Sequence, residues 1–319
     1  MKINKDFDLS KVLWYKIGGK AKYFLEVSNR RDLLTAIDFI NRNKITNYLI
    51  IGAGSNMLFP DYDFVGVVVQ LKPDNNIKLV NENVIEAFAG EKLDDVINFS
   101  FEHNLIGLEW AGGMPGTIGA AVRGNAGAFG GELKDVFKSA EIINISNNEI
   151  TNLNKDDMNF SYRESVVKQN ENLLILSVRF FLKKASNDEV EKAKKVYFSN
   201  IKYRKEKHPL DFANCGSVFK NIIDEENVKK ILSVWPDIKD KVDNNWHGKI
   251  AMAYIINRLG FSGFKIGNAK VSEKHNNFIV NLGNAKCSDV LHIVAAIKKK
   301  FFDTFGFLPE TEVEIIRYN

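Results

Sequence analysis

Apolar residues follow a strand–helix–strand pattern in the first quarter of the chain. Residues 23–27 and 48–51 are short apolar runs, and residues 31–43 between them carry apolar side chains at helical spacing. A β-branched run at 65–69 comes after Gly52. The pattern predicts an α/β unit with a glycine loop between two of its strands.

The second quarter repeats this theme and then changes texture. Residues 77–80 and 84–87 predict a hairpin, and residues 92–103 predict a helix with one apolar face. Nine of the 22 glycines then fall between residues 107 and 131, so this stretch fits neither helix nor strand. We expect a loop system dominated by backbone there.

A polar helix is predicted over residues 186–207. It opens on Ser186 with Glu189 three residues later, which is capping-box spacing, and Pro209 disfavours helical geometry at His208. A domain boundary is therefore expected after residue 207. The remaining expected elements are strands near 141–145, 173–181, 264–272, 277–281 and 311–317 and helices near 224–233, 248–259 and 287–305.

Composition narrows the class of protein. The net charge of +4 is too small for a dedicated nucleic-acid binder, and glutamates interleave with the lysines of the polar helix. The N-terminal sixteen residues lack a signal-peptide core, and no apolar run approaches membrane-spanning length. Cys215 and Cys287 are the two cysteines, and the five histidines lack metal-ligand spacing. We expect a cytoplasmic protein with reduced thiols, no metal, and neither a nucleic-acid nor a membrane partner.

The first glycine loop is Gly52-Ala53-Gly54-Ser55-Asn56. It follows a strand, but Met57 occupies the place of the third glycine in a dinucleotide fingerprint, and the lysine of a P-loop is missing. Two interpretations stay open. The loop is either a tight turn or a run of backbone N–H groups that converge on an anion.

A second loop runs from Trp110 to Gly119, with four glycines, a proline and Thr117, and Asn125-Ala126-Gly127 follows shortly after. Glycine permits close approach of the backbone to a ligand. Two such loops in one α/β framework favour a large diphosphate ligand. Packing between the loops is the alternative.

Six short motifs occur in a fixed order, from about Trp14 to Ile316: GAGSN, GLEWAGGMPGTIGAAVRGNAGAFGGE, NFSYRES, NCGSVFKN, KVSEKHNNFIVN and ETEVEII. Together they resemble the family of UDP-N-acetylenolpyruvoylglucosamine reductase, also called UDP-N-acetylmuramate dehydrogenase. This family acts in bacterial peptidoglycan synthesis, and so in cell-wall biogenesis, cell shape and cell division.

The resemblance implies a mixed α/β fold (α+β) of the vanillyl-alcohol-oxidase, or PCMH, FAD-binding type. Residues 1–72, joined by a C-terminal strand within 307–319, and residues 73–207 would form two FAD-binding subdomains, and residues 208–306 a substrate-binding domain. The implied reaction uses NADPH to reduce noncovalent FAD, which then reduces UDP-N-acetylglucosamine enolpyruvate to UDP-N-acetylmuramate. A related PCMH-fold flavin oxidase acting on a sugar or alcohol is the alternative, although neither glycine loop holds the histidine that often links flavin there.

The resemblance also implies roles for particular residues. Arg163 and Glu312 would flank the substrate carboxylate, and Ser217 would supply a proton. The implied substrate-binding residues are Tyr162, Lys220, Asn221, Lys274 and His275. The implied FAD-binding residues are Gly52, Ala53, Gly54, Ser55, Asn56, Met57, Gly112, Gly113, Pro115, Gly116, Thr117, Gly119, Asn125, Ala126 and Gly127.

The chain departs from the family pattern at two places. The segment between Arg179 and His208 is too short for the tyrosine-bearing loop of some members, which indicates the class without that loop. Ile222 replaces the usual proline after the serine motif, and residues 222–247 are longer than expected.

Overall fold

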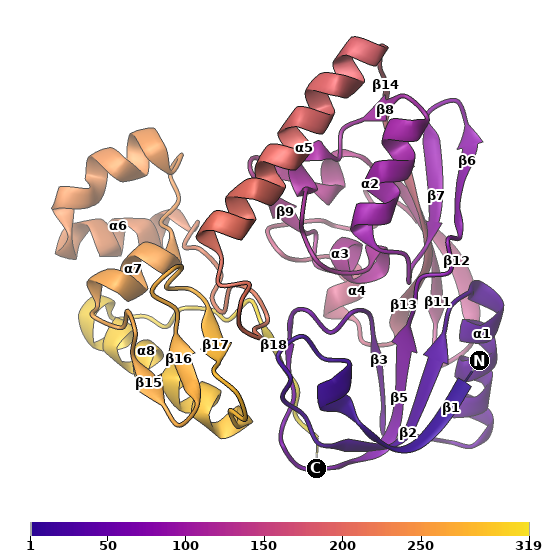
Figure 1. Ribbon diagram of the computed structural model, residues 1–319, viewed down its shortest axis with the longest axis horizontal. Helices are drawn as coiled ribbons and strands as arrows, with labels where there is room; N and C mark the ends of the chain where they lie inside the picture. The colour runs from indigo at the N-terminus through magenta and orange to yellow at the C-terminus, as the bar shows by residue number, and fades with distance from the viewer. Residues whose placement is uncertain (1, 319) are drawn as a thin grey trace. The chain divides into compact units, whose positions relative to one another are not determined.

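The computed structural model describes residues 2–318, which form two compact units (Figure 1). The first unit comprises the chain up to Phe7, Ala21–Ala53 and Phe64–Glu206, and the second comprises Asp8–Lys20, Gly54–Asp63 and the chain from Lys207 onward. One boundary between the units falls between Glu206 and Lys207. Residues on both sides of position 72 belong to one unit, so the three-part division stays a prediction.

The second unit also takes residues that were assigned to the first subdomain. The Tyr15 hydroxyl donates to the Ile279 carbonyl at 2.8 Å, and β18 (Glu314–Ile315) pairs in parallel with β4 (Met57–Leu58). These long-range contacts hold residues 8–20, 54–63 and the C-terminal strand in one unit. Sequence periodicity carries no signal for such pairings.

The first sheet of unit 1 has the order β1-β2-β5-β3, and β2 and β3 both pair in parallel with β5. Its strands are β1 (Lys2–Asp8), β2 (Lys20–Val27), β3 (Tyr48–Ile51) and β5 (Phe64–Leu71). Helix α1 (Arg30–Arg42) begins where the Asn29 side chain accepts from the Asp32 amide at 2.9 Å. The predicted strand–helix–strand pattern is confirmed, while β1 is missed because its sequence is mostly polar.

The second sheet of unit 1 is antiparallel, with the order β12-β11-β13-β7-β6. Its strands are β6 (Ile77–Asn81), β7 (Val84–Phe88), β11 (Phe137–Asn144), β12 (Glu149–Asn154) and β13 (Leu173–Phe181). Buried residues of α1, α2 (Leu93–Glu102) and both sheets share one core. Arg30 of α1 makes a bidentate ion pair with Glu141 of β11 at 2.8 and 2.7 Å.

The glycine-rich segment 107–131 is not a pure loop system, which corrects the prediction. It contains a 3₁₀ turn (Glu109–Ala111), helix α3 (Ile118–Arg123) and the short hairpin β9–β10 (Gly127–Ala128 and Gly131–Glu132). Gly119 lies in α3. A Cβ there would approach the Ala89 Cβ to 2.8 Å, so the position requires glycine. Close packing, rather than loop flexibility, explains the glycine.

The first unit also contains α4 (Val166–Gln169), the long α5 (Asn187–Lys207) and the pair β8 (Leu105–Ile106) with β14 (Lys183–Lys184). The predicted capping box is present. Glu189 accepts from the Ser186 amide at 2.9 Å, and the Ser186 Oγ accepts from the Glu189 amide at 3.4 Å. The start and end of α5 are therefore as predicted.

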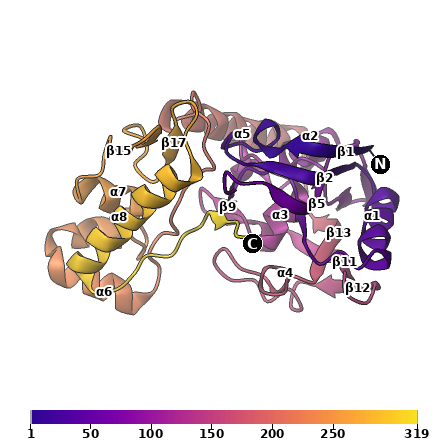
Figure 2. The ribbon, with the colours of Figure 1, turned by 90° about the horizontal axis from the view of Figure 1, so that it is seen from below.

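In the second unit a small antiparallel sheet, β15-β16-β17, lies against the long helix α8 (Figures 1 and 2). The elements are β15 (Lys265–Ile266), β16 (Ala269–Val271), β17 (Ile279–Asn281), α6 (Glu225–Val234), α7 (Met252–Arg258) and α8 (Cys287–Phe305). The single strand predicted over 264–272 is instead a hairpin, because Gly267 turns the chain at φ 53°. The predicted strand over 311–317 is shorter, at β18.

The long segment 222–247 is folded rather than a loop. After α6 it forms two short turns, Pro236–Ile238 and Lys241–Asn245, and Arg258 of α7 pairs bidentately with Asp237 at 2.6 and 2.9 Å. Both cysteines are free and buried, and burial raises the pKa of Cys287 to about 11. None of the helices described over residues 2–318 is long and apolar enough to cross a membrane.

Candidate active site

In the first unit, Gly52 of the first glycine loop packs directly against Thr117 of the second loop. A Cβ added to Gly52 would lie 2.3 Å from the Thr117 Oγ1, so the two loops pack without a side chain between them. Thr117 is only 3% exposed, and within residues 2–318 its Oγ1 has no hydrogen-bond partner. A buried hydroxyl without a partner is costly. A ligand oxygen at this junction would satisfy it, which fits the predicted diphosphate.

The second loop requires glycine at two of its predicted FAD-binding positions. Gly113 and Gly116 have φ of 70° and 131°, where residues with a Cβ are disfavoured. Gly112 is constrained by space, since a Cβ there would lie 2.3 Å from the Tyr197 carbonyl oxygen. The glycines therefore serve both backbone conformation and close packing. The packing interpretation of the second loop therefore accounts for Gly112, and ligand binding by the loop stays a prediction.

Arg204 of α5 lies against the second loop, and sequence analysis missed it. Its Nε donates to the Gly112 carbonyl at 3.0 Å, its guanidinium stacks 5.2 Å from the Phe129 ring, and burial lowers its pKa. Its Nη2 is buried, and the described residues offer it no acceptor. The position reads in sequence as one of many basic residues on a solvated helix. Only the packing singles it out.

Arg163 lies in a tight turn at the start of α4. The amides of Ser161 and Glu164 donate to each other's carbonyls at 3.2 Å, and Arg163 adopts φ 61° between them. Its Nη2 donates to the Gly127 carbonyl at 2.8 Å, and its guanidinium lies 5.0 Å from the Tyr162 ring. The structure thus brings Arg163, Tyr162 and Gly127 together in the first unit.

Asn125 connects this turn to the glycine-rich segment. It is fully buried, and its Nδ2 donates to the Ser161 carbonyl at 2.9 Å and to Glu132 at 3.1 Å. Its Oδ1 accepts from the Lys134 amide at 3.1 Å. These hydrogen bonds of the Asn125 side chain join the turn at Ser161 to the glycine-rich segment. The predicted FAD contact of Asn125 stays a prediction.

Ser217 and Glu312 lie on neighbouring backbone segments of the second unit. The Glu312 amide donates to the Val218 carbonyl at 2.8 Å, and the Lys220 amide donates to the Glu310 carbonyl at 3.0 Å. Both Ser217 and Glu312 are half-buried. The structure therefore brings together the backbone segments of two of the three predicted catalytic residues, although the sequence separates them widely.

A buried asparagine holds the serine segment from its other side. Asn277 is 3% exposed; its Oδ1 accepts from the Phe219 amide at 3.0 Å and its Nδ2 donates to the Phe219 carbonyl at 2.8 Å. The motif around Lys274 and His275 contains Asn277, but sequence analysis did not assign it. Asn276 and Asn277 are adjacent, and the sequence does not show which of them has a structural role.

Asn56 of the first glycine loop reaches the same region. Its Nδ2 donates to the Glu312 carbonyl at 3.1 Å, and its carbonyl accepts from the Glu314 amide at 3.0 Å. The remaining residues of that loop in the second unit, among them Gly54, Ser55 and Met57, precede or form β4. Arg163 and Thr117 belong to the first unit, so the predicted site residues are divided between the two units.

The predicted substrate-binding residues of the second unit fall into two groups. Lys220 pairs with Glu310 at 3.0 Å, and the Asn221 Oδ1 accepts from the Met252 amide at the start of α7 at 3.0 Å. The Asn221 side chain therefore caps the N-terminus of α7, in addition to its predicted role in substrate binding. The second group is the turn that holds Lys274 and His275.

The turn at 274–276 contains two buried polar atoms whose partners are missing among the described residues. They are the Nδ1 of His275 and the Oδ1 of Asn276. Burial lowers the pKa of His275, whose ring lies 5.3 Å from His208 and 4.7 Å from Phe278. Two buried polar atoms left unpaired on adjacent residues are suited to a polar ligand.

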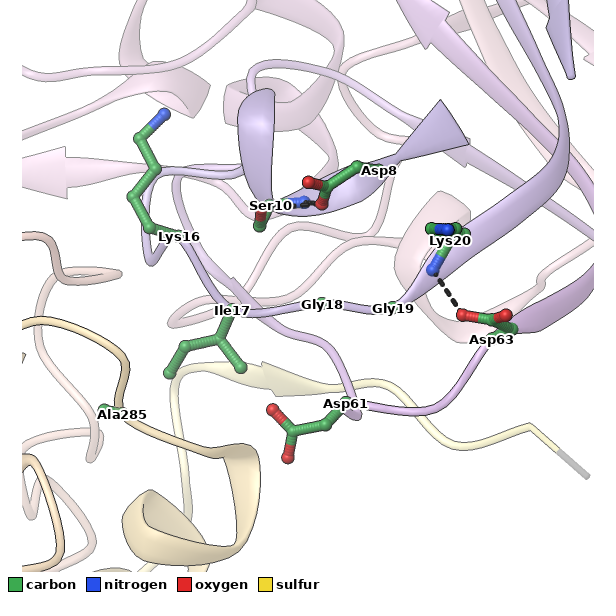
Figure 3. A pocket seen from close by; sticks show the side chains of 10 residues that line it. All are labelled: Asp8, Ser10, Lys16, Ile17, Gly18, Gly19, Lys20, Asp61, Asp63 and Ala285. Carbon is green, nitrogen blue, oxygen red and sulfur yellow. Dashed lines mark hydrogen bonds between the residues drawn. The ribbon is translucent and has the colours of Figure 1, made fainter. Parts of the chain in front are cut away.

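One hollow in the second unit does not belong to this site (Figure 3). Its volume is about 380 Å³, and Asp8, Asp61 and Asp63 line it. Each carboxylate accepts from a backbone amide, namely those of Ser10, Cys287 and Lys20, at 3.0, 2.8 and 2.8 Å. These carboxylates hold loops in place. Residues 2–318 contain no group of His, Cys, Asp or Glu side chains that could hold a metal ion.

Two parts of the chain match known protein families. Residues 21–154 match an FAD-binding domain, and residues 208–316 match the C-terminal domain of UDP-N-acetylenolpyruvoylglucosamine reductase. The reductase of Thermus caldophilus, a crystal structure, shares the fold with a TM-score of 0.75 over 99% of this chain and 100% of its own, at 24% identity. The predicted mixed α/β fold and the FAD cofactor are confirmed.

Two relatives of the same description cover nearly the whole chain. The UDP-N-acetylenolpyruvoylglucosamine reductase of Caldicellulosiruptor bescii is 36% identical over 98% of this chain and 90% of its own length. That of Fusobacterium nucleatum is 32% identical over 99% of this chain and 100% of its own. The chain belongs to the UDP-N-acetylenolpyruvoylglucosamine reductase family.

Proposed function

We propose that this protein reduces UDP-N-acetylglucosamine enolpyruvate to UDP-N-acetylmuramate through Arg163, Ser217 and Glu312, with NADPH as hydride donor. The observation that carries the proposal is the backbone contact between the Ser217 and Glu312 segments through Val218, at 2.8 Å. It supports placing a hydroxyl and a carboxyl in one reaction centre.

FAD supplies the hydride chemistry, because it can accept hydride from NADPH and give it to an alkene. The residues that would hold it are those of the two glycine loops. The unpartnered Thr117 hydroxyl and the Gly52–Thr117 close approach support a phosphate oxygen at that junction. Arg204, with an unpartnered Nη2 beside Gly112, is an additional candidate for a phosphate contact.

Each catalytic residue then has a distinct task. Hydride addition to the enolpyruvyl group develops negative charge on its carboxylate, which the Arg163 guanidinium would stabilise, while Glu312 flanks the same group. The neighbouring carbon needs a proton, which the Ser217 hydroxyl donates. A serine hydroxyl is a weak acid, but the carbanionic acceptor is strongly basic. Tyr162, Lys220, Asn221, Lys274 and His275 would bind the nucleotide and sugar.

We also propose that the protein belongs to the class of this family that lacks the tyrosine-bearing loop. Residues 183–184 form β14, and α5 then occupies Asn187–Lys207 without interruption, so the segment before His208 contains no additional loop. We place the reaction in the cytoplasm, as part of peptidoglycan precursor synthesis. The partners are then NADPH and the enolpyruvyl nucleotide.

A spectroscopic experiment tests the proposal. Purified protein should show the visible spectrum of noncovalent FAD, bleach on addition of NADPH without air, and regain its colour with UDP-N-acetylglucosamine enolpyruvate. Persistence of the yellow colour with NADPH would exclude the reductase reaction. Reoxidation by oxygen alone, with no response to the nucleotide, would favour the oxidase alternative.

Arg204→Met should weaken FAD binding without unfolding the protein. Loss of a charge-assisted hydrogen bond of about 1.5–3 kcal/mol predicts an FAD dissociation constant roughly tenfold to a hundredfold higher. Fluorescence titration of the apoprotein measures the constant. Lys202→Met on the same helix is the matched control, because Lys202 is exposed and pairs only loosely with Glu206 at 3.9 Å. Equal affinities for the two variants would remove Arg204 from the cofactor site.

A further inference from the structure

Arg163 has a backbone conformation that residues with a Cβ rarely adopt. Its φ is 61°, which lies in the left-handed region. Such a conformation persists only where surrounding contacts determine it, and it recurs at sites where a side chain must be held in one direction. Contacts around Arg163 must therefore fix its peptide planes.

Lys168 makes the side-chain contact that fixes the plane after Arg163. Its Nζ donates to the Arg163 carbonyl at 2.6 Å and to the Glu164 Oε1 at 3.0 Å. Lys168 is the third of the four residues of α4, and its side chain is only 26% exposed. An ammonium between a carbonyl and a carboxylate is a charge-assisted arrangement, stronger than a contact between neutral groups.

Hydrogen bonds hold the N-terminus of α4, and they fix the backbone of Lys168. Ser165 is its N-cap and accepts from the Lys168 amide at 3.3 Å. The Ser165 Oγ also donates to the Arg123 carbonyl at 2.6 Å, at the end of α3. The support for Arg163 thus continues from Lys168 through Ser165 to the helix that follows the second glycine loop.

We infer that Lys168 is a positioning residue for Arg163: its ammonium holds the Arg163 carbonyl and thereby sets the direction of the guanidinium. In that direction the Arg163 Nη2 donates to the Gly127 carbonyl at 2.8 Å. Rotation of the peptide plane at Arg163 would move the guanidinium off that carbonyl. The inference rests on the proposed role of Arg163 at the substrate carboxylate.

Lys168→Met in the holoenzyme tests this inference by stopped-flow absorbance of the two half-reactions. We expect flavin reduction by NADPH to stay within about twofold, and the limiting rate of reoxidation by the enolpyruvyl nucleotide to fall about tenfold to a hundredfold, the scale of a misplaced catalytic group. Lys168→Arg, which keeps a cationic donor, should recover most of the rate. A Lys168→Met loss shared equally by both half-reactions would overturn the inference.

A double-mutant cycle with Arg163→Met separates positioning from general stability. If Lys168 acts through Arg163, adding Lys168→Met to Arg163→Met slows reoxidation no further. Additive losses would overturn the inference. Lys194→Met, which breaks the exposed Lys194–Glu191 pair at 2.8 Å, is the matched control and should leave both half-reactions unchanged.

The cycle also distinguishes failure of the inference from failure of the proposed function. Normal reoxidation in Arg163→Met would remove Arg163 from the proposed mechanism, and the inference with it. Slow reoxidation in Arg163→Met with normal reoxidation in Lys168→Met would overturn the inference alone. Flavin content and thermal midpoint identify any variant that misfolds, and Lys168→Leu, which also lacks a donor, then takes the place of Lys168→Met in the cycle.

Discussion

Ser217→Ala should leave flavin reduction by NADPH nearly unchanged while slowing reoxidation by the enolpyruvyl nucleotide by about 10²–10⁴-fold, the usual contribution of a positioned general acid. The hydroxyl is proposed to protonate the carbon next to the one that receives hydride. Without it, the developing charge has no proton donor at that carbon. Stopped-flow absorbance of the flavin measures both half-reactions separately.

The structure explains why this substitution should not disturb the fold. The serine segment is held through its backbone: the Val218 amide donates to the Asn277 carbonyl at 2.8 Å, and the Asn277 side chain bonds both the amide and the carbonyl of Phe219. Ser233→Ala on α6 is the matched control, because its hydroxyl bonds only the Lys230 carbonyl of its own helix. A similar loss in both half-reactions of Ser217→Ala would make Ser217 structural and not a proton donor.

Gly52→Ala should weaken FAD binding. The new Cβ would lie 2.3 Å from the Thr117 Oγ1 and 3.3 Å from the Thr117 Cβ, so the two glycine loops must separate. Overpacking of this kind costs about 1–3 kcal/mol, and here the strain falls on the junction proposed to hold a phosphate. We expect a dissociation constant at least about tenfold higher, so that the protein purifies with little yellow colour.

A second glycine provides the matched control for this prediction. A Cβ on Gly124 would lie 3.6 Å from the Ala120 carbonyl oxygen, an ordinary contact, and Gly124 has φ −90° at the end of α3. Gly124→Ala should therefore bind FAD normally. Fluorescence titration and far-ultraviolet circular dichroism measure cofactor affinity and folding. Stoichiometric FAD at unchanged affinity in folded Gly52→Ala would show that the loop junction does not hold the cofactor.

The local pattern of apolar and polar residues was sufficient to predict most of the helices and strands. The boundaries of α1, α5, α6 and α8 follow from apolar spacing and from capping residues such as Ser186, because these signals act over a few residues. The same reasoning failed where packing decides. It treated Gly119 as a loop residue although it lies in α3, and it gave one strand where Gly267 makes a hairpin.

The sequence by itself determined the family, the cofactor and the residue types available for chemistry, because ordered motifs record them directly. Tertiary structure decided which of those residues meet. It joined the Ser217 and Glu312 segments through Val218, and it set Gly52 against Thr117. It also gave Lys168 and Arg204 partners that their positions on polar helices do not suggest. The physical reason is that hydrogen bonds and close approaches between distant segments depend on the folded backbone, which no local pattern of side chains encodes.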